Sequence, residues 1–200
     1  MNKKVILFCG VESTGKTTMI EQVFNHLKNK GLTCQIVSEV GREVCALSGG
    51  VDEMTILDYE LILHKHQTNF LQSLYSDCDI ILLDTDSIYT RYYLEKDQNL
   101  YNQDVKYSKK LVKLSENIVK SNLKNKRISH VFYLDSLCDF VQDGTRTYEK
   151  TRSQDDKYLY KLYSKMYSQN CTFNKISGRG WNQRTQQVIV KIEQYLKHSL

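Results

Sequence analysis

Five short apolar, β-branched runs alternate along this chain with segments of helical periodicity. Strands that alternate with helices form βαβ units, which place helices on both faces of a parallel sheet. We therefore expect an α/β protein with three α/β/α layers around a central five-stranded parallel sheet. The five runs are Val5–Cys9, Cys34–Val37, Ile80–Leu83, Val131–Leu134 and Cys171–Ile176. Ligands of such folds lie beyond the carboxyl ends of the strands, so the residues after each run carry the most information.

The length and composition of the chain fit one globular domain. At 200 residues, with 40% hydrophobic and 26% charged residues, the chain is predicted to fold as a single domain over residues 1–200. No apolar run approaches the roughly 20 residues of a membrane span, and the N-terminus does not resemble a signal peptide. The 6 cysteines are scattered without a CxxC pair, which argues against zinc sites and disulfides. We expect a cytoplasmic protein that does not associate with membranes.

The net charge of +5 is unevenly distributed. Residues 1–100 carry 9 Lys+Arg against 14 Asp+Glu, whereas residues 101–200 carry 19 against 9. Eight of the basic residues lie between 106 and 127, where Leu111, Leu114, Ile118 and Leu123 recur at roughly helical spacing. The pattern predicts an amphipathic helix with a solvated basic face. A nucleic-acid patch is the less favoured alternative, because no aromatic stacking residues accompany the charge.

A phosphate-binding loop follows the first run. Gly10 to Thr17 fits G-x-x-x-x-G-K-[ST] in full, with a strand predicted before it and a helix after it. Such a loop turns successive N–H groups toward phosphate oxygens, the lysine reaches the β- and γ-phosphates, and the hydroxyl joins the Mg²⁺ shell. ATP or GTP binding with Mg²⁺ is predicted, with Lys16 catalytic and Thr17 a metal ligand. The predicted nucleotide-binding residues of this region are Gly10, Glu12, Ser13, Thr14, Gly15, Lys16, Thr17 and Thr18.

Two aspartates follow the third run. Ile80 to Asp84 is an apolar strand that ends in a carboxylate, the form of a Walker B motif. An acid there can hold the water shell of Mg²⁺ opposite Thr17. Asp86 lies two residues further on, and we predict catalytic roles for both acids. The alternative for both is a helix N-cap, where aspartate is common.

The acceptor side is expected after the second run, placed beside the tip of the first strand. Glu39 can take a proton from an acceptor hydroxyl, and Arg42 can hold an anion or a ribose oxygen. His66 and Gln67, on the following helix, are further candidates for contact with the acceptor. The alternative is a surface helix start with a solvated Glu–Arg pair, and a solvated His–Gln pair.

A lid is predicted at about residues 140–153, after the fourth run. Arg146 and Arg152 would bring guanidinium charge onto the phosphoryl oxygens when such a segment closes and excludes water. We expect both to bind ATP, with Arg146 also catalytic. The alternative is a set of exposed helix charges.

Taken together, these stretches resemble the ribosylnicotinamide kinase domain of the NadR type, in the P-loop kinase superfamily. The matching elements are Gly10–Thr17 with its Glu12-Ser13, Glu39–Glu43 with its Gly-Arg-Glu, His66-Gln67, Asp84-Thr85-Asp86 and Asp143–Arg146. The resemblance implies a P-loop kinase fold and ATP-dependent phosphorylation of the 5′-hydroxyl of nicotinamide riboside to nicotinamide mononucleotide. Glu39, Arg42, His66, Gln67 and Asp86 are the predicted substrate-binding residues. We expect neither a preceding helix-turn-helix domain nor, without a His-x-Gly-His signature, an adenylyltransferase domain, so DNA-binding repression and the second NAD-forming step are not implied.

Other functions remain open at this point. A deoxynucleoside or nucleoside-monophosphate kinase, such as a thymidylate kinase, is the nearest alternative, because Arg91 could bind an acceptor phosphate. A non-catalytic nucleotide-binding regulator is more distant. The expected partner is a small nucleoside, homo-oligomers are left open, and the stretch 97–107 is an insertion to which the sequence assigns no role.

Overall fold

The computed structural model describes residues 3–136, 151–178 and 180–197. Five parallel strands form one sheet in the order β2-β3-β1-β4-β5. Their bounds are β1 (Lys4–Cys9), β2 (Cys34–Val37), β3 (Ile80–Asp84), β4 (His130–Leu134) and β5 (Thr172–Ile176). Each lies within one residue of the range expected from the sequence. The predicted five-stranded parallel sheet is confirmed.

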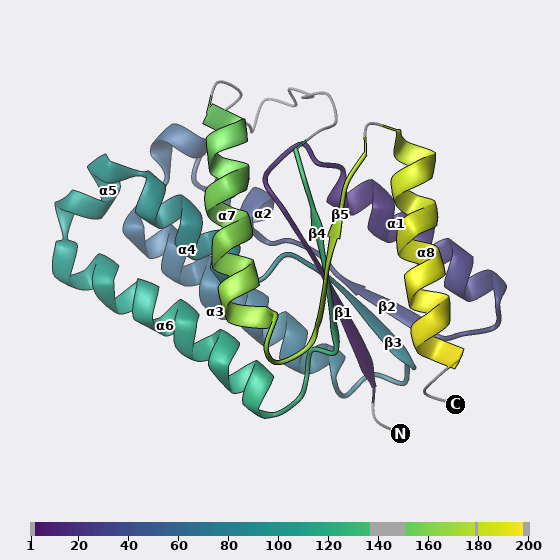
Figure 1. Cartoon of the computed structure of the whole chain (residues 1–200). Helices are drawn as coiled ribbons and strands as arrows, with labels where there is room; N and C mark the ends of the chain where they lie inside the picture. The colour runs from purple at the N-terminus through teal and green to yellow at the C-terminus, as the bar shows by residue number, and fades with distance from the viewer. Residues whose placement is uncertain (1–2, 137–150, 179, 198–200) are drawn as a thin grey trace.

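Helices cover both faces of the sheet (Figure 1). The helices are α1 (Lys16–Asn29), α2 (Gly41–Leu47), α3 (Ile56–Ser73), α4 (Ser87–Lys96), α5 (Gln98–Gln103), α6 (Val105–Lys124), α7 (Arg152–Tyr167) and α8 (Trp181–Lys197), with a 3₁₀ turn η1 (Val51–Glu53). In β1, Ile6 and Phe8 pack toward α1 and α8, whereas Val5 and Leu7 pack toward α3, α4, α6 and α7. This alternation follows from the two-residue period of a strand. The three-layer α/β/α fold is therefore confirmed.

Helix α6 has the amphipathic character that its sequence predicts. Leu111 and Val119 are buried, while the lysines at 106, 109, 110, 113, 120 and 124 are exposed. The stretch 97–107 forms α5 and the start of α6, and Leu100 of α5 packs with Tyr59 and Leu94. Its packing role is to close a small core beside α3 and α4. Among the helices of the described residues, none has both the length and the hydropathy for a membrane span.

The strand order brings the functional loops to one edge of the sheet. Strand β3 lies between β1 and β2, so the expectation that β2 adjoins the tip of β1 was wrong. After β2 the chain passes through α3 and returns to the sheet as β3, which lies between β2 and β1. Asp84 pairs in register with Phe8, one residue before the end of β1. The acid that ends β3 is consequently adjacent to the phosphate loop. Glu39, after β2, is separated from the loop by one intervening strand.

Candidate active site

The loop between β1 and α1 has the conformation of a phosphate cradle. Gly10 and Gly15 have φ angles of 141° and 74°, and Ser13 has a φ of 57°. A Cβ at Gly10 would lie 2.2 Å from the carbonyl oxygen of Leu134, and one at Gly15 would overlap the indole of Trp181. Glycine is thus required here both for the backbone conformation and for close packing. The loop ends at the N-terminus of α1, where unpaired N–H groups and the helix dipole favour an anion.

Lys16 is buried beneath this loop. Its Nζ donates to the carbonyl oxygens of Gly10 and Val11 at 2.9 and 2.8 Å, and lies 5.0 Å from the centre of the Tyr89 ring. Burial lowers the pKa of Lys16, and the negative charges of Asp84 and Glu39 oppose that decrease. The ammonium is therefore held inside the loop by neutral carbonyls and nearby carboxylates, where phosphate oxygens would be stronger partners.

Thr17 and Asp84 form the pair expected of a magnesium site. The Thr17 hydroxyl donates to Asp84 Oδ2 at 2.8 Å. The other oxygen, Oδ1, is buried and has no hydrogen-bond partner within the described part of the chain. Burial raises the pKa of Asp84, while Lys16 and the Thr17 hydrogen bond oppose the increase. An unsatisfied carboxylate oxygen beside a hydroxyl is the oxygen-only donor set that Mg²⁺ prefers, so these residues fit the metal.

We expect Asp84→Asn to raise the Mg²⁺ concentration that half-saturates nucleotide binding by about 10- to 100-fold. The amide keeps an oxygen for Thr17 but loses the negative charge that attracts the cation. Isothermal titration with AMP-PNP at a series of Mg²⁺ concentrations measures the shift. Asp79→Asn is the matched control, because Asp79 precedes the same strand and binds Thr33 at its opposite end. An unchanged Mg²⁺ dependence in Asp84→Asn would remove the residue from the metal site.

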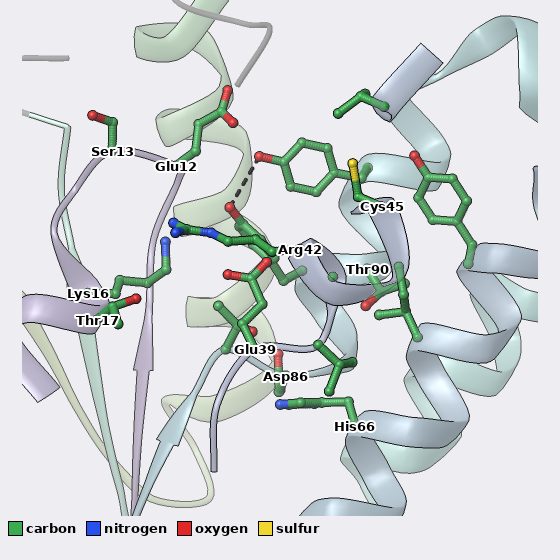
Figure 2. Close-up of a pocket in the computed structure, with 18 of the residues that line it drawn as sticks. Glu12, Ser13, Lys16, Thr17, Glu39, Arg42, Cys45, His66, Asp86 and Thr90 are labelled. Carbon is green, nitrogen blue, oxygen red and sulfur yellow. Dashed lines mark hydrogen bonds between the residues drawn. The ribbon is translucent and has the colours of Figure 1, made fainter. Parts of the chain in front are cut away.

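Glu39 and Arg42 converge with Lys16 in the centre of one pocket (Figure 2). Glu39 is half-buried after β2, and Arg42 lies in the first turn of α2. Burial raises the pKa of Glu39 to about 7, the charge of Asp84 adds to the increase, and Lys16 and Arg42 oppose it. A carboxyl group with this pKa can accept a proton near neutral pH and release it again, as a general base must.

Asp86 is placed differently from the other acids. It is the N-cap residue of α4, and its Oδ1 accepts from the main-chain nitrogen of Ile88 at 3.1 Å. The hydroxyl groups of Tyr163 and Tyr167 on α7 also donate to its carboxylate. Asp86 contributes to the pocket lining, but these donors occupy its oxygens. The N-cap, which the sequence left as the alternative, is therefore present.

The two candidates on α3 lie in different places. His66 is buried in the pocket lining, and its Nε2 has no hydrogen-bond partner among the described residues. Burial lowers the pKa of His66 to about 4, against a hydrogen bond to the main chain of Asp84, so the ring is neutral at physiological pH. Gln67 instead pairs with Asn122 on α6, at 3.3 and 3.2 Å, and does not belong to the described pocket lining.

The structure describes one of the two arginines of the predicted lid. Arg152, the first residue of α7, is buried and donates from Nη2 to the main-chain oxygen of Ser13 at 2.9 Å. It therefore contacts the phosphate loop, where the sequence expects a nucleotide-binding arginine. Arg146 and residues 140–150 of the predicted lid lie outside the described residues.

The pocket extends from the phosphate loop into a chamber lined by aromatic and apolar side chains, with a cavity volume of about 320 Å³. The sequence analysis did not identify the aromatic and apolar residues, which are Cys45, Met54, Tyr59, Ile62, Tyr89 and Tyr93, or the polar Thr90 beside them. Tyr89 and Tyr93 are four residues apart on α4 and their hydroxyls are 3.2 Å apart. Their helical spacing directly after Asp86 was the one available signal, since it places both on one face of the helix.

The phosphate loop, the paired Thr17 and Asp84, and the 2-3-1-4-5 sheet together define a nucleotide-binding protein with the P-loop kinase fold. The chain belongs to the AAA_28 family, described as "AAA domain", whose model matches residues 5–184. No curated protein matches the chain in sequence.

Solved structures share this fold. The NadR protein in complex with NR superimposes with a TM-score of 0.74 and 19% identity, covering 97% of this chain and 52% of that one. The present chain thus spans about half the length of NadR. Thymidylate kinase from Candida albicans has a TM-score of 0.62 at 14% identity, covering 98% of this chain and 94% of its own. Thymidylate kinase from Ehrlichia chaffeensis has a TM-score of 0.59 at 12% identity, covering 98% and 100%. The resemblance to a NadR-like P-loop kinase domain is therefore confirmed at the level of the fold.

Proposed function

We propose that this chain is an ATP-dependent kinase that phosphorylates the 5′-hydroxyl of nicotinamide riboside to give nicotinamide mononucleotide. One observation carries the proposal. Glu39, Lys16 and Arg42 lie in the same cavity as the tyrosine-lined chamber, so an aromatic base and a reacting hydroxyl fit one continuous site. The likeness to NadR, which was solved with NR, supports the same substrate. We further propose that residues 1–200 act as one kinase domain in the cytoplasm.

In this reaction the acceptor oxygen forms a bond to the γ-phosphorus as the bond from that phosphorus to the ADP oxygen breaks. Glu39 takes the proton that leaves the 5′-hydroxyl. Lys16 and Arg42 stabilise the negative charge on the transferring oxygens, and the neutral His66 ring offers a hydrogen bond to the acceptor. Thr17 and Asp84 would hold Mg²⁺, which when bound neutralises phosphate charge. Arg152 holds the phosphate loop from the N-terminus of α7.

The charge of the pocket favours a cationic nucleoside. Its described lining contains four carboxylates, from Glu12, Glu21, Glu39 and Asp86, against two cations, Lys16 and Arg42. The pyridinium ring of nicotinamide riboside is positively charged, and tyrosine rings attract such a cation through their faces. A nucleoside monophosphate would instead bring two negative charges into this lining.

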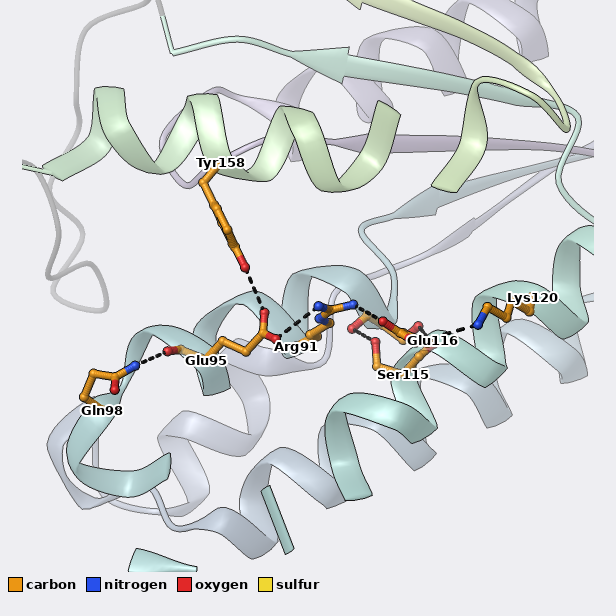
Figure 3. Close-up of polar contacts among 8 residues, drawn as sticks. Arg91, Glu95, Gln98, Ser115, Glu116, Lys120 and Tyr158 are labelled. Carbon is orange, nitrogen blue, oxygen red and sulfur yellow. Dashed lines mark hydrogen bonds and ion pairs between the residues drawn. The ribbon is translucent and has the colours of Figure 1, made fainter. Parts of the chain in front are cut away.

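Arg91, the residue that favours a thymidylate kinase, is occupied elsewhere. Its guanidinium pairs with Glu95 at 3.1 Å and Glu116 at 2.6 Å, between α4 and α6 (Figure 3). Arg91 does not belong to the described lining of the pocket. Arg91, which suggested a phosphate-bearing acceptor, therefore connects α4 with α6 instead.

The test is a phosphorylation assay with Mg·ATP that compares nicotinamide riboside, thymidine and thymidine monophosphate by mass spectrometry. We expect the highest kcat/KM for nicotinamide riboside, because its charge matches the lining. Arg91→Ala serves as the control and should leave the order of the three substrates unchanged. A preference for either thymidine compound would overturn the proposed acceptor and would leave the kinase reaction standing.

A further inference from the structure

The carboxylate of Asp86 is enclosed by donors from two helices. Tyr163 Oη donates to Oδ1 at 2.7 Å, Tyr167 Oη donates to Oδ2, and the main chain of Ile88 donates to Oδ1. Asp86 and both tyrosines are buried. A carboxylate offers about four acceptor positions, and three are used by these donors. The hydrogen bonds thus connect the tip of β3 with α7 rather than with a ligand.

The two aspartates diverge because of the residue between them. Thr85 has a φ of 64°, a left-handed conformation that is strained for a β-branched side chain. Such strain persists only where surrounding contacts determine the backbone. Thr85 N donates to the Phe8 carbonyl at 2.9 Å, and the bonds at Asp86 hold the next residue. The turn directs Asp84 toward Thr17 and Asp86 toward α7.

Helix α7 runs from the Asp86 bonds to the phosphate loop. Tyr163 and Tyr167 are one turn apart, with nearly parallel rings. Arg152 lies eleven residues before Tyr163, roughly 16 Å along the axis, and binds Ser13 of the loop. On its outer face α7 contacts α4 through the ion pair of Lys96 with Asp155 and the bond from Tyr158 to Glu95, which Figure 3 shows in part. The C-terminal half of α7 is therefore fixed at the tip of β3, and the N-terminus of the helix places Arg152 at the phosphate loop.

We propose that Asp86 is a positioning residue, which with Tyr163 and Tyr167 forms a clamp that sets Arg152 against the phosphate loop and Asp84 against Thr17. The sequence assigns Asp86 to catalysis and substrate binding, whereas the geometry indicates that Asp86 acts through the positions of Arg152 and Asp84. The proposal rests on nucleotide binding at this loop, as the proposed function does, but not on the identity of the acceptor.

The test measures the affinity for AMP-PNP with saturating Mg²⁺ by isothermal titration. Variants Asp86→Asn, Tyr163→Phe with Tyr167→Phe, and Arg152→Ala are compared with wild type. We expect each variant to raise the Kd for AMP-PNP by about 5- to 20-fold. When the Asp86 or tyrosine substitutions are combined with Arg152→Ala, we expect them to raise the Kd less than twofold beyond that of Arg152→Ala alone. The reason is that the effects of residues that act through one another are not additive. KM for the acceptor should change less than twofold in the paired tyrosine variant and in Arg152→Ala, which leave the charged side chains of the described cavity lining in place. Tyr160→Phe, on the same helix with its ring against Phe173, is the control and should bind normally.

Two results would overturn the clamp. The first is a combination of two results: the paired Tyr→Phe variant binds AMP-PNP with wild-type affinity, and Asp86→Asn lowers kcat by more than 100-fold. Together these results would make Asp86 a catalytic residue. The second is full additivity with Arg152→Ala, which would show that the effect does not pass through Arg152. The phenylalanine variants keep the buried rings, and a thermal melt identifies any variant that does not fold. Because the acceptor assay above is independent of these affinities, failure of the clamp and failure of the proposed substrate are distinguishable.

Discussion

Replacing Lys16 by alanine is expected to lower kcat by about 10²- to 10³-fold or more while the protein still folds. The lysine acts through its charge on phosphate oxygens, and removal of one such stabilising group typically costs this much. Its ammonium contacts two loop carbonyls and the face of Tyr89, so the loss of packing is small beside the loss of charge. Steady-state phosphorylation kinetics with a thermal melt measure both quantities.

Lys28→Ala is the matched control for Lys16. Lys28 is on the same helix, exposed, and lies over the ring of Phe24. We expect it to retain wild-type kcat. Turnover of Lys16→Ala near that of the control would remove the lysine from the transfer step and, with it, the functional reading of the whole loop.

Glu39→Gln is expected to lower kcat/KM by about 10²- to 10⁴-fold, the usual contribution of a general base. The amide keeps the shape of the side chain but cannot take the proton of the 5′-hydroxyl. The pH dependence provides the sharper readout. Since burial raises the pKa of Glu39 to about 7, the carboxyl is protonated and inactive below that pH, so wild-type kcat/KM should rise with pH and level off above about 7.

In Glu39→Gln this rise should disappear, because the group that titrates is gone. Glu43→Gln is the control, since Glu43 lies four residues further along the chain and pairs with Lys65 outside the cavity lining. A Glu39→Gln variant that keeps the same pH profile as wild type would assign the proton transfer to another group. A profile unchanged in shape but reduced in height would assign Glu39 to orientation of the acceptor.

The phosphate-binding half of the site could be predicted from the sequence because its residues are local. Gly10 to Thr17 are consecutive, and their bend is imposed by glycine at positive φ. Asp84 ends a strand whose other residues are all apolar, which predicts that the strand is buried. Adjacent parallel strands bring their carboxyl ends to the same edge of the sheet. Lys16, Thr17 and Asp84 accordingly meet in the structure as the sequence predicts.

The acceptor half depends on packing between distant segments. The sequence predicts that Glu39, Asp84 and Asp86 are all catalytic, and any of the three could orient or deprotonate the acceptor hydroxyl. The structure separates them because Thr17 binds one and two tyrosines nearly eighty residues away bind another. Gln67 adjoins His66 in sequence, yet a turn of one residue rotates it about 100° around the helix, out of the cavity and onto Asn122.

By itself, the amino-acid sequence determined the layered fold, the position of the phosphate loop and the acid opposite Thr17, since hydrophobic periodicity and the two glycines of one short loop act over short distances. The tertiary structure alone decided the strand order, the tyrosine lining of the chamber, the helix contacts of Arg91 and the enclosure of Asp86. Each of these depends on which side chains from separate helices meet, and that is fixed by packing of the complete core rather than by any local pattern.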